Sequence, residues 1–168
     1  MIWTLMLLLW EEVSVCIIPA QLQWPAKLTL IPGGVFCLKT LREHGLRVVL
    51  YEAGTDLGGT WRWNRYPGAR VDSEVPEYQF SWPEVYKDWT WTTNYPNYQE
   101  LRAYFDHVDK VLDIKKDCSF ETVVTGAQFK PSEGKWHVET EDGRVAKAKY
   151  FIVAAGFVRM PSCFYVGP

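Results

Sequence analysis

The chain has 168 residues, which is enough for one domain with a hydrophobic core. Its 48% hydrophobic and 23% charged residues are ordinary for a globular protein, and its net charge is −2. This balance gives no electrostatic reason to expect nucleic acid or an anionic membrane as a partner. Aromatic residues reach 15% and crowd into residues 61–105, which indicates either a flat ligand or a Trp-rich core.

The cysteines and histidines show no spacing typical of a metal site. They are scattered along the chain at Cys16, Cys37, Cys118 and Cys163, and at His44, His107 and His137. We therefore expect no metal. We also expect reduced, unpaired thiols in a reducing compartment, which favours a cytoplasmic protein.

Residues 1–31 form an atypical apolar N-terminal segment, in which two apolar runs are separated by Glu11-Glu12. Neither run reaches the roughly 20 residues that a membrane-spanning helix needs. No Lys or Arg precedes the first run, as it would in a signal peptide. We therefore expect neither secretion nor membrane anchoring.

From Pro32 onward the pattern becomes that of a dinucleotide-binding unit. Pro32-Gly33-Gly34 reads as a turn, residues 35–45 as a helix, and 46–52 as an apolar strand that ends at Glu52. A carboxylate at a strand end can accept hydrogen bonds from both hydroxyls of a ribose. Glu52 is therefore a candidate ribose ligand, and the alternative is a solvated strand end.

Only the last part of the glycine fingerprint of such a unit is present in this sequence. If Gly34 is the third glycine of G-x-G-x-x-G, the first two positions are occupied by Thr29 and Ile31. Their branched side chains leave no room for the close approach of a pyrophosphate. Taken alone, Gly33-Gly34 is a very weak signal.

The second half of the chain contains a helix and several short strands. Residues 73–95 read as an ordered aromatic loop region with a candidate short helix. Asn97 and Glu100 resemble a capping box, which predicts a helix from there to about Leu112. Hairpin and strand signals then follow in the runs 119–130, 135–141 and 144–149 and in the buried strand 149–156.

The stretch 51–72, YEAGTDLGGTWRWNRYPGARVD, is long and rich in rare residues. With the helix ELRAYFDHVDKVLD and the final strand FIVAAG, it makes residues 33–156 resemble the flavin-binding N-terminal part of Baeyer–Villiger monooxygenases. These enzymes use FAD and NADPH to insert an oxygen atom beside a ketone carbonyl. The resemblance implies an α/β fold: an incomplete Rossmann-like FAD-binding domain, with a parallel sheet and helices, plus a small antiparallel β-meander. The corresponding division is an N-terminal segment 1–31, a truncated FAD-binding domain 32–160 and a C-terminal stub 161–168.

The same resemblance implies roles for individual residues. Glu52 would bind the adenosine ribose of FAD, Tyr78 would close over the cofactor, and Asp72 would act catalytically beside the reactive edge of the isoalloxazine. The implied cofactor-binding set is Gly33, Gly34, Glu52, Gly58, Gly59, Thr60, Trp61, Arg70, Asp72, Tyr78 and Val124. Two alternatives stay open: core packing for Trp61, and a surface ion pair for Arg70 and Asp72.

The sequence also departs from the family pattern at both ends. The opening strand and first two glycines are replaced, Ala155 stands where a hydroxyl residue is usual, and the NADPH domain is not represented. One hypothesis covers both ends: a partial or misassembled product of a longer gene, with the family sequence resuming near Pro32. We then expect an FAD-binding piece without turnover of the family's small-molecule ketone. The alternative is a catalytically dead protein that acts through interactions or weak nucleotide binding.

Overall fold

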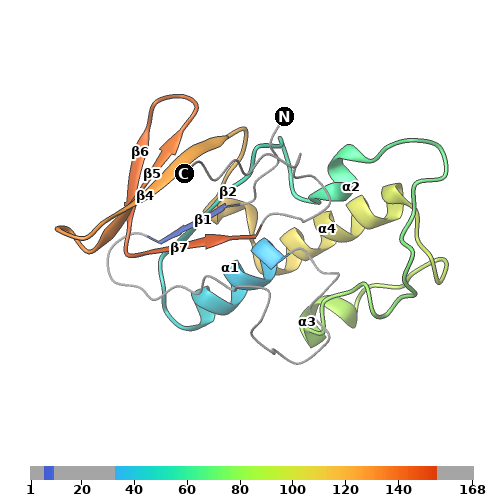
Figure 1. The fold of residues 1–168 in the computed structure, drawn as a ribbon. Coiled ribbons are helices and arrows are strands. Elements are labelled where there is room, and N and C mark those ends of the chain that lie inside the picture. The colour runs from blue at the N-terminus through green and yellow to red at the C-terminus, as the bar shows by residue number, and fades with distance from the viewer. Residues whose placement is uncertain (1–5, 10–32, 155–168) are drawn as a thin grey trace.

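The computed structural model describes residues 6–9 and 33–154, which form short helices and strands (Figure 1). Their buried side chains form two hydrophobic clusters. The predictions for Thr29, Ile31, Pro32, Ala155, Gly156 and residues 161–168 lie outside the described residues. The elements in chain order are β1 (Met6–Leu9), α1 (Gly33–Glu43), β2 (Val48–Tyr51), α2 (Thr60–Trp63), α3 (Pro83–Tyr86), α4 (Tyr98–Leu112), the 3₁₀ helix η1 (Lys115–Asp117), β3 (Cys118–Ser119), β4 (Val124–Lys130), β5 (Lys135–Thr140), β6 (Val145–Ala148) and β7 (Tyr150–Val153).

The main sheet has four strands in the order β3-β2-β1-β7. β2 is parallel to β3, whereas β1 is antiparallel to both β2 and β7. The strands β2, β3 and β7 therefore run in the same direction, and their carboxyl ends meet at one edge of the sheet. This edge is where open α/β sheets bind their ligands.

β1 is the unexpected part of the sheet, because the sequence patterns predicted no strand before Pro32. Its residue Leu7 lies opposite Leu50 of β2 and Ile152 of β7. Without β1, the facing edges of β2 and β7 would have unpaired backbone groups, and a strand of either direction can pair them. In the glycine-fingerprint unit the first strand runs parallel to its neighbours and leads directly into the helix. Here β1 runs the opposite way, and residues 10–32 separate it from α1.

The two faces of this sheet are covered by different layers, as the alternation of side chains along the strands requires. Leu50 and Ile152 belong to the main core, together with residues of α1 and α4. Tyr51 and Phe151 belong instead to a second cluster, with residues of β4, β5 and β6. Cover on both faces explains why β2 is apolar throughout.

α1 begins at Gly33, slightly earlier than predicted, and ends at Glu43, two residues before Gly45. Gly45 has φ +75°, and its N–H donates to the carbonyl of Arg42 at 2.9 Å. The N–H of Leu46 donates to the carbonyl of Leu41 at 3.1 Å. These two bonds form a Schellman motif, which satisfies carbonyls at the helix end.

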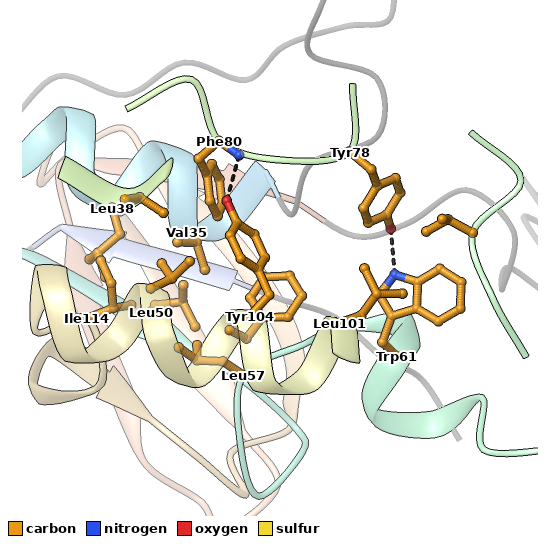
Figure 2. Packing of buried hydrophobic residues seen from close by; sticks show 14 of the residues in the cluster. Val35, Leu38, Leu50, Leu57, Trp61, Tyr78, Phe80, Leu101, Tyr104 and Ile114 are labelled. Carbon is orange, nitrogen blue, oxygen red and sulfur yellow. Dashed lines mark hydrogen bonds between the residues drawn. The ribbon is translucent and has the colours of Figure 1, made fainter. Parts of the chain in front are cut away.

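α4 is the longest helix of the described residues and lies under the main core (Figure 2). Asn97 caps it, since its side-chain oxygen accepts a hydrogen bond from the Glu100 N–H at 3.0 Å. The carboxylate of Glu100 accepts instead from the N–H and hydroxyl of Thr92, so only half of the capping box forms. The predicted apolar stripe is buried at Leu101, Tyr104, Phe105 and Val108.

The antiparallel meander β4–β5–β6 confirms the predicted hairpins. The first hairpin turns through Gly134 at φ +62° and the second through Gly143 at φ +84°. The short helix expected within 73–95 is α3. Aromatic rings from the rest of that region pack on α4, as the ring of Phe80 does on that of Tyr104. The hydroxyl of Tyr104 also accepts the Phe80 N–H at 2.8 Å (Figure 2).

Candidate nucleotide site at the carboxyl edge of the sheet

The carboxyl edge of the main sheet brings together the start of α1 and the residues that follow β2 and β7. Glu52 follows β2, and Ala154 follows β7. A Cβ added at Gly33 would lie 3.8 Å from the Cβ of Ala154, so the first turn of α1 lies beside the end of β7. Gly34, the second predicted glycine, is buried within that turn.

Glu52 is a buried carboxylate, with only 4% of its surface exposed. Its Oε1 accepts the N–H of Gly54 at 2.7 Å. Its backbone is held by the carbonyl of Ser119 and the N–H of Thr122, both at 3.0 Å. Burial raises the pKa of Glu52, while the Gly54 N–H and the charge of Arg62 act in the opposite direction. The alternative of a solvated strand end is therefore wrong.

The predicted double-glycine turn connects this carboxylate to α2. Gly58 has φ +121° and Gly59 φ +50°, conformations that L side chains rarely adopt. The carbonyl of Gly58 accepts the N–H of Trp61, and that of Gly59 accepts the N–H of Arg62, both at 3.0 Å. A Cβ added at Gly58 would lie 3.7 Å from the ring of Phe105, so the turn rests on α4. Glycine is required here by the backbone conformation.

Three of the predicted site residues interact with one another: Trp61 of α2, Tyr78 and Asp72. The indole N–H of Trp61 donates to the hydroxyl of Tyr78 at 2.6 Å, and both rings are almost completely buried (Figure 2). Burial raises the pKa of Tyr78; the Trp61 N–H acts in the opposite direction, and the negative charge of Asp72 raises it further. Trp61, Tyr78 and Asp72 therefore form one electrostatically connected group.

Arg70 and Asp72 lie on an extended segment beside the start of α4. The backbone there pairs with residues 96–98: the Val71 N–H donates to the carbonyl of Pro96 at 3.2 Å. Val71 is buried, whereas Arg70 and Asp72 on either side of it are exposed. Within the described residues no ion pair joins the two side chains, so the alternative of a surface ion pair has no support. Both side chains are accessible to a ligand.

Val124 opens β4, opposite Thr140 of β5, and is buried against the meander. The segment that leads to it runs beside the residues after β2, because Glu121 and Thr122 donate their N–H groups to the carbonyls of Gly54 and Glu52. The strand-end carboxylate and the start of β4 are therefore neighbours. Thr60, the remaining predicted residue, begins α2 and is exposed.

Two polar residues at this edge were missed by the sequence analysis. Arg62 acts electrostatically on Glu52. Its Cγ lies 3.7 Å from where a Gly54 Cβ would be, and its Nε is buried without a partner among the described residues. Asp56 binds Lys115, far along the chain, at 2.9 Å. No local pattern distinguishes such charges from solvated surface residues.

The described part of the chain contains no cluster of three or more His, Cys, Asp or Glu side chains arranged to hold a metal ion. Within the same residues, no helix combines the length and the apolar character needed to cross a membrane.

The fold and the strand-end carboxylate together define a Rossmann-like nucleotide-binding unit. The family described as the NAD(P)-binding Rossmann-like domain matches residues 32–108. That range contains α1, β2, Glu52 and the double-glycine turn. The class of protein is therefore supported both by geometry and by sequence.

More specific relatives are monooxygenases. The chain is 70% identical over 124 residues to the FAD-binding monooxygenase acrE of Aspergillus aculeatus, covering 74% of this chain and 21% of the relative. It is 40% identical over 130 residues to an acetone monooxygenase (methyl acetate-forming) of Gordonia sp., covering 77% and 24%. A solved structure of oxidized steroid monooxygenase bound to NADP superimposes with a TM-score of 0.69 at 35% identity, covering 73% and 24%.

The chain is thus homologous to the N-terminal part of FAD-binding monooxygenases of the Baeyer–Villiger type. It spans about a quarter of the length of these relatives, between 21% and 24% in the three named. The predicted resemblance and the Rossmann-like fold class are confirmed.

Proposed function

We propose that this chain is an FAD-binding part of an FAD- and NADPH-dependent monooxygenase of the Baeyer–Villiger type. The observation that carries the proposal is the buried carboxylate of Glu52, placed at the carboxyl edge of the sheet in the loop that leads to the double-glycine turn. Burial of a carboxylate without a full ion pair is costly. A ligand that offers two hydroxyl groups to it would offset that cost, as the ribose of an adenine dinucleotide does.

The donor and acceptor set at this edge fits FAD. Glu52 would accept hydrogen bonds from the adenosine ribose, and the backbone beside Val124 would border the adenine. Tyr78 keeps its proton at neutral pH, because its pKa is raised by burial, and Trp61 holds its hydroxyl in place. Asp72 would present its charge at the reactive edge. The bound flavin would supply the redox and oxygen chemistry, and the protein would supply position and electric field.

The relatives support a proposal for the activity of the whole protein. The name of the Gordonia relative states that it is an acetone monooxygenase, which supports a small ketone as the substrate class here. The NADP-bound steroid monooxygenase supports NADPH as the reductant. We further propose that the protein works in the cytoplasm, in keeping with the free thiol of Cys118.

Titration of the purified chain with FAD tests this proposal. We expect flavin fluorescence to be quenched on binding and the protein to turn yellow. Glu52→Gln should weaken binding, whereas Glu77→Gln, at an exposed position, should not. A wild-type chain that stays colourless and leaves FAD fluorescence unchanged would contradict the proposal. It would favour the alternative of a protein that acts through interactions or weak nucleotide binding.

A further inference from the structure

Lys115 lies among three carboxylates from two separate parts of the chain. Its Nζ is 2.9 Å from Oδ1 of Asp56, 3.4 Å from Oδ1 of Asp106 and 3.9 Å from Oδ2 of Asp109. Its backbone N–H also donates to Oδ1 of Asp109 at 2.7 Å, which ties η1 to α4. Only 33% of the Lys115 side chain is exposed. This arrangement is more constrained than a single pair of mobile surface side chains.

Asp56 lies between Glu52 and Gly58 in sequence, in the loop that follows β2. Its Oδ1 accepts the N–H of Leu57 at 2.8 Å as well as the Lys115 ammonium. Burial alone would raise the pKa of Asp56, but the ammonium and the Leu57 N–H outweigh it and lower that pKa. Burial likewise opposes the charge of Lys115, and the surrounding carboxylates outweigh it and raise its pKa. Both groups are therefore charged at neutral pH.

The loop that carries Asp56 contains glycines, so its shape depends on the contacts that hold it. Gly58 and Gly59 adopt positive φ, and glycine loses more conformational freedom on ordering than any other residue. Leu57 is buried, and a Cβ added at Gly58 would contact the ring of Phe105 of α4. Asp106 and Asp109, which also hold Lys115, lie on the same helix. The ammonium thus joins the loop to the helix on which the double-glycine turn rests.

We propose that Lys115 is a positioning residue for the cofactor segment Gly58–Trp61. By pairing with Asp56, it holds this segment on α4 in the conformation that receives the nucleotide. The inference rests on the proposed function, because it names a residue outside the nucleotide site that prepares that site for FAD. Removing the charge should weaken FAD binding by roughly three- to tenfold, as expected for the loss of about 1 kcal/mol of preorganisation.

The experiment compares Lys115→Met, Lys115→Arg and the matched control Lys116→Met. Lys116 pairs with Asp113 at 2.8 Å on the surface, so the control removes the same charge from the neighbouring position. Two quantities are measured: the FAD dissociation constant by fluorescence quenching, and amide hydrogen exchange of Gly58 and Gly59 in the cofactor-free protein. We expect Lys115→Met to weaken FAD binding and to speed exchange at both glycines. Lys115→Arg should restore both, and Lys116→Met should change neither.

Asp56→Asn provides a second route, which also covers a Lys115→Met protein that fails to fold. Asn keeps an acceptor for the Leu57 N–H but loses the ion pair, so it should reproduce the Lys115→Met effect. The double variant should add little to either single change, because the two residues act through one contact. If wild-type protein binds FAD and both single variants bind it equally well, with unchanged glycine exchange, the inference is overturned. If wild-type protein binds no FAD, the proposed function fails. Faster glycine exchange in the variants would still support the role of Lys115 in holding the segment Gly58–Trp61 on α4.

Discussion

The indole N–H of Trp61 and the hydroxyl of Tyr78, 17 residues apart in sequence, form a buried hydrogen bond of 2.6 Å. Their rings pack edge to face, with centroids 6.0 Å apart. Trp61 therefore packs in the main core, as one of the two interpretations held. A role of Trp61 at the flavin remains a prediction. In that role Trp61 and Tyr78 would together line the flavin site.

Tyr78→Phe should destabilise the protein by about 1–3 kcal/mol, because it leaves the buried N–H of Trp61 without an acceptor. Urea denaturation measures the free energy of unfolding. Tyr66→Phe is the matched control, since Tyr66 is 60% exposed and removal of its hydroxyl should change stability by less than about 0.5 kcal/mol. Equal stabilities of the two variants would show that the pair does not hold the core together.

Glu52→Gln should change how stability depends on pH. Burial raises the pKa of Glu52 in the folded chain above its ordinary value of 4.5, so the folded state holds this proton more tightly than the unfolded chain does. Protonated Glu52 therefore stabilises the folded chain. This contribution to the free energy of unfolding is complete below pH 4.5 and is lost as the pH rises through the folded pKa. Glutamine does not titrate. The free energy of unfolding of Glu52→Gln should therefore increase relative to that of wild type as the pH rises across this window.

The neighbouring thiol of Cys118 does not titrate in the same pH range, so the pH dependence can be assigned to Glu52. Burial raises the pKa of the Cys118 thiol to about 12, far above the window. Urea denaturation at a series of pH values, on both proteins, gives the difference directly. A difference that stays constant from acid to neutral pH would contradict a raised pKa at Glu52.

Gly58→Ala should destabilise the protein by about 1–3 kcal/mol, because φ of +121° is strained for any residue with a Cβ. The change should also weaken FAD binding, since the turn would relax away from its present shape. Gly126→Ala is the control, because Gly126 lies in a strand and its added Cβ would meet only the flexible end of Glu139 at 3.7 Å. That substitution should leave FAD binding unchanged. An equally stable Gly58→Ala protein would show that the turn tolerates another conformation.

Asn97→Ala should cost about 1 kcal/mol, the usual effect of removing a helix N-cap. The expectation depends on the bond from the Glu100 N–H to the Asn97 side chain, the only half of the capping box that forms. Asn94→Ala, in the preceding loop, is a suitable control, because Asn94 accepts the Val75 N–H through its backbone carbonyl, which the substitution keeps. Thermal unfolding of both variants should show a lower midpoint for Asn97→Ala alone.

Much of the architecture could be predicted because its signals are local. The apolar stripe of α4, the cap at Asn97, the glycine at the end of α1 and the hairpin at Asp142-Gly143 each depend on residues only a few positions apart. Such patterns express backbone preferences that hold in almost any surroundings. The strand-end position of Glu52 was predictable for the same reason.

The sequence by itself determined the class of the unit: an acid-tipped strand, a double-glycine turn and a capped helix, in an order typical of Rossmann-like FAD-binding domains. Only the tertiary structure decided that β1 runs antiparallel between β2 and β7, that Trp61 bonds Tyr78, and that Lys115 binds Asp56. The physical reason is that these contacts join distant parts of the chain. Packing decides which group pairs with an unpaired strand edge, a buried indole N–H or a loop carboxylate. Each of these can pair with many partners, so no local pattern predicts the one that it meets.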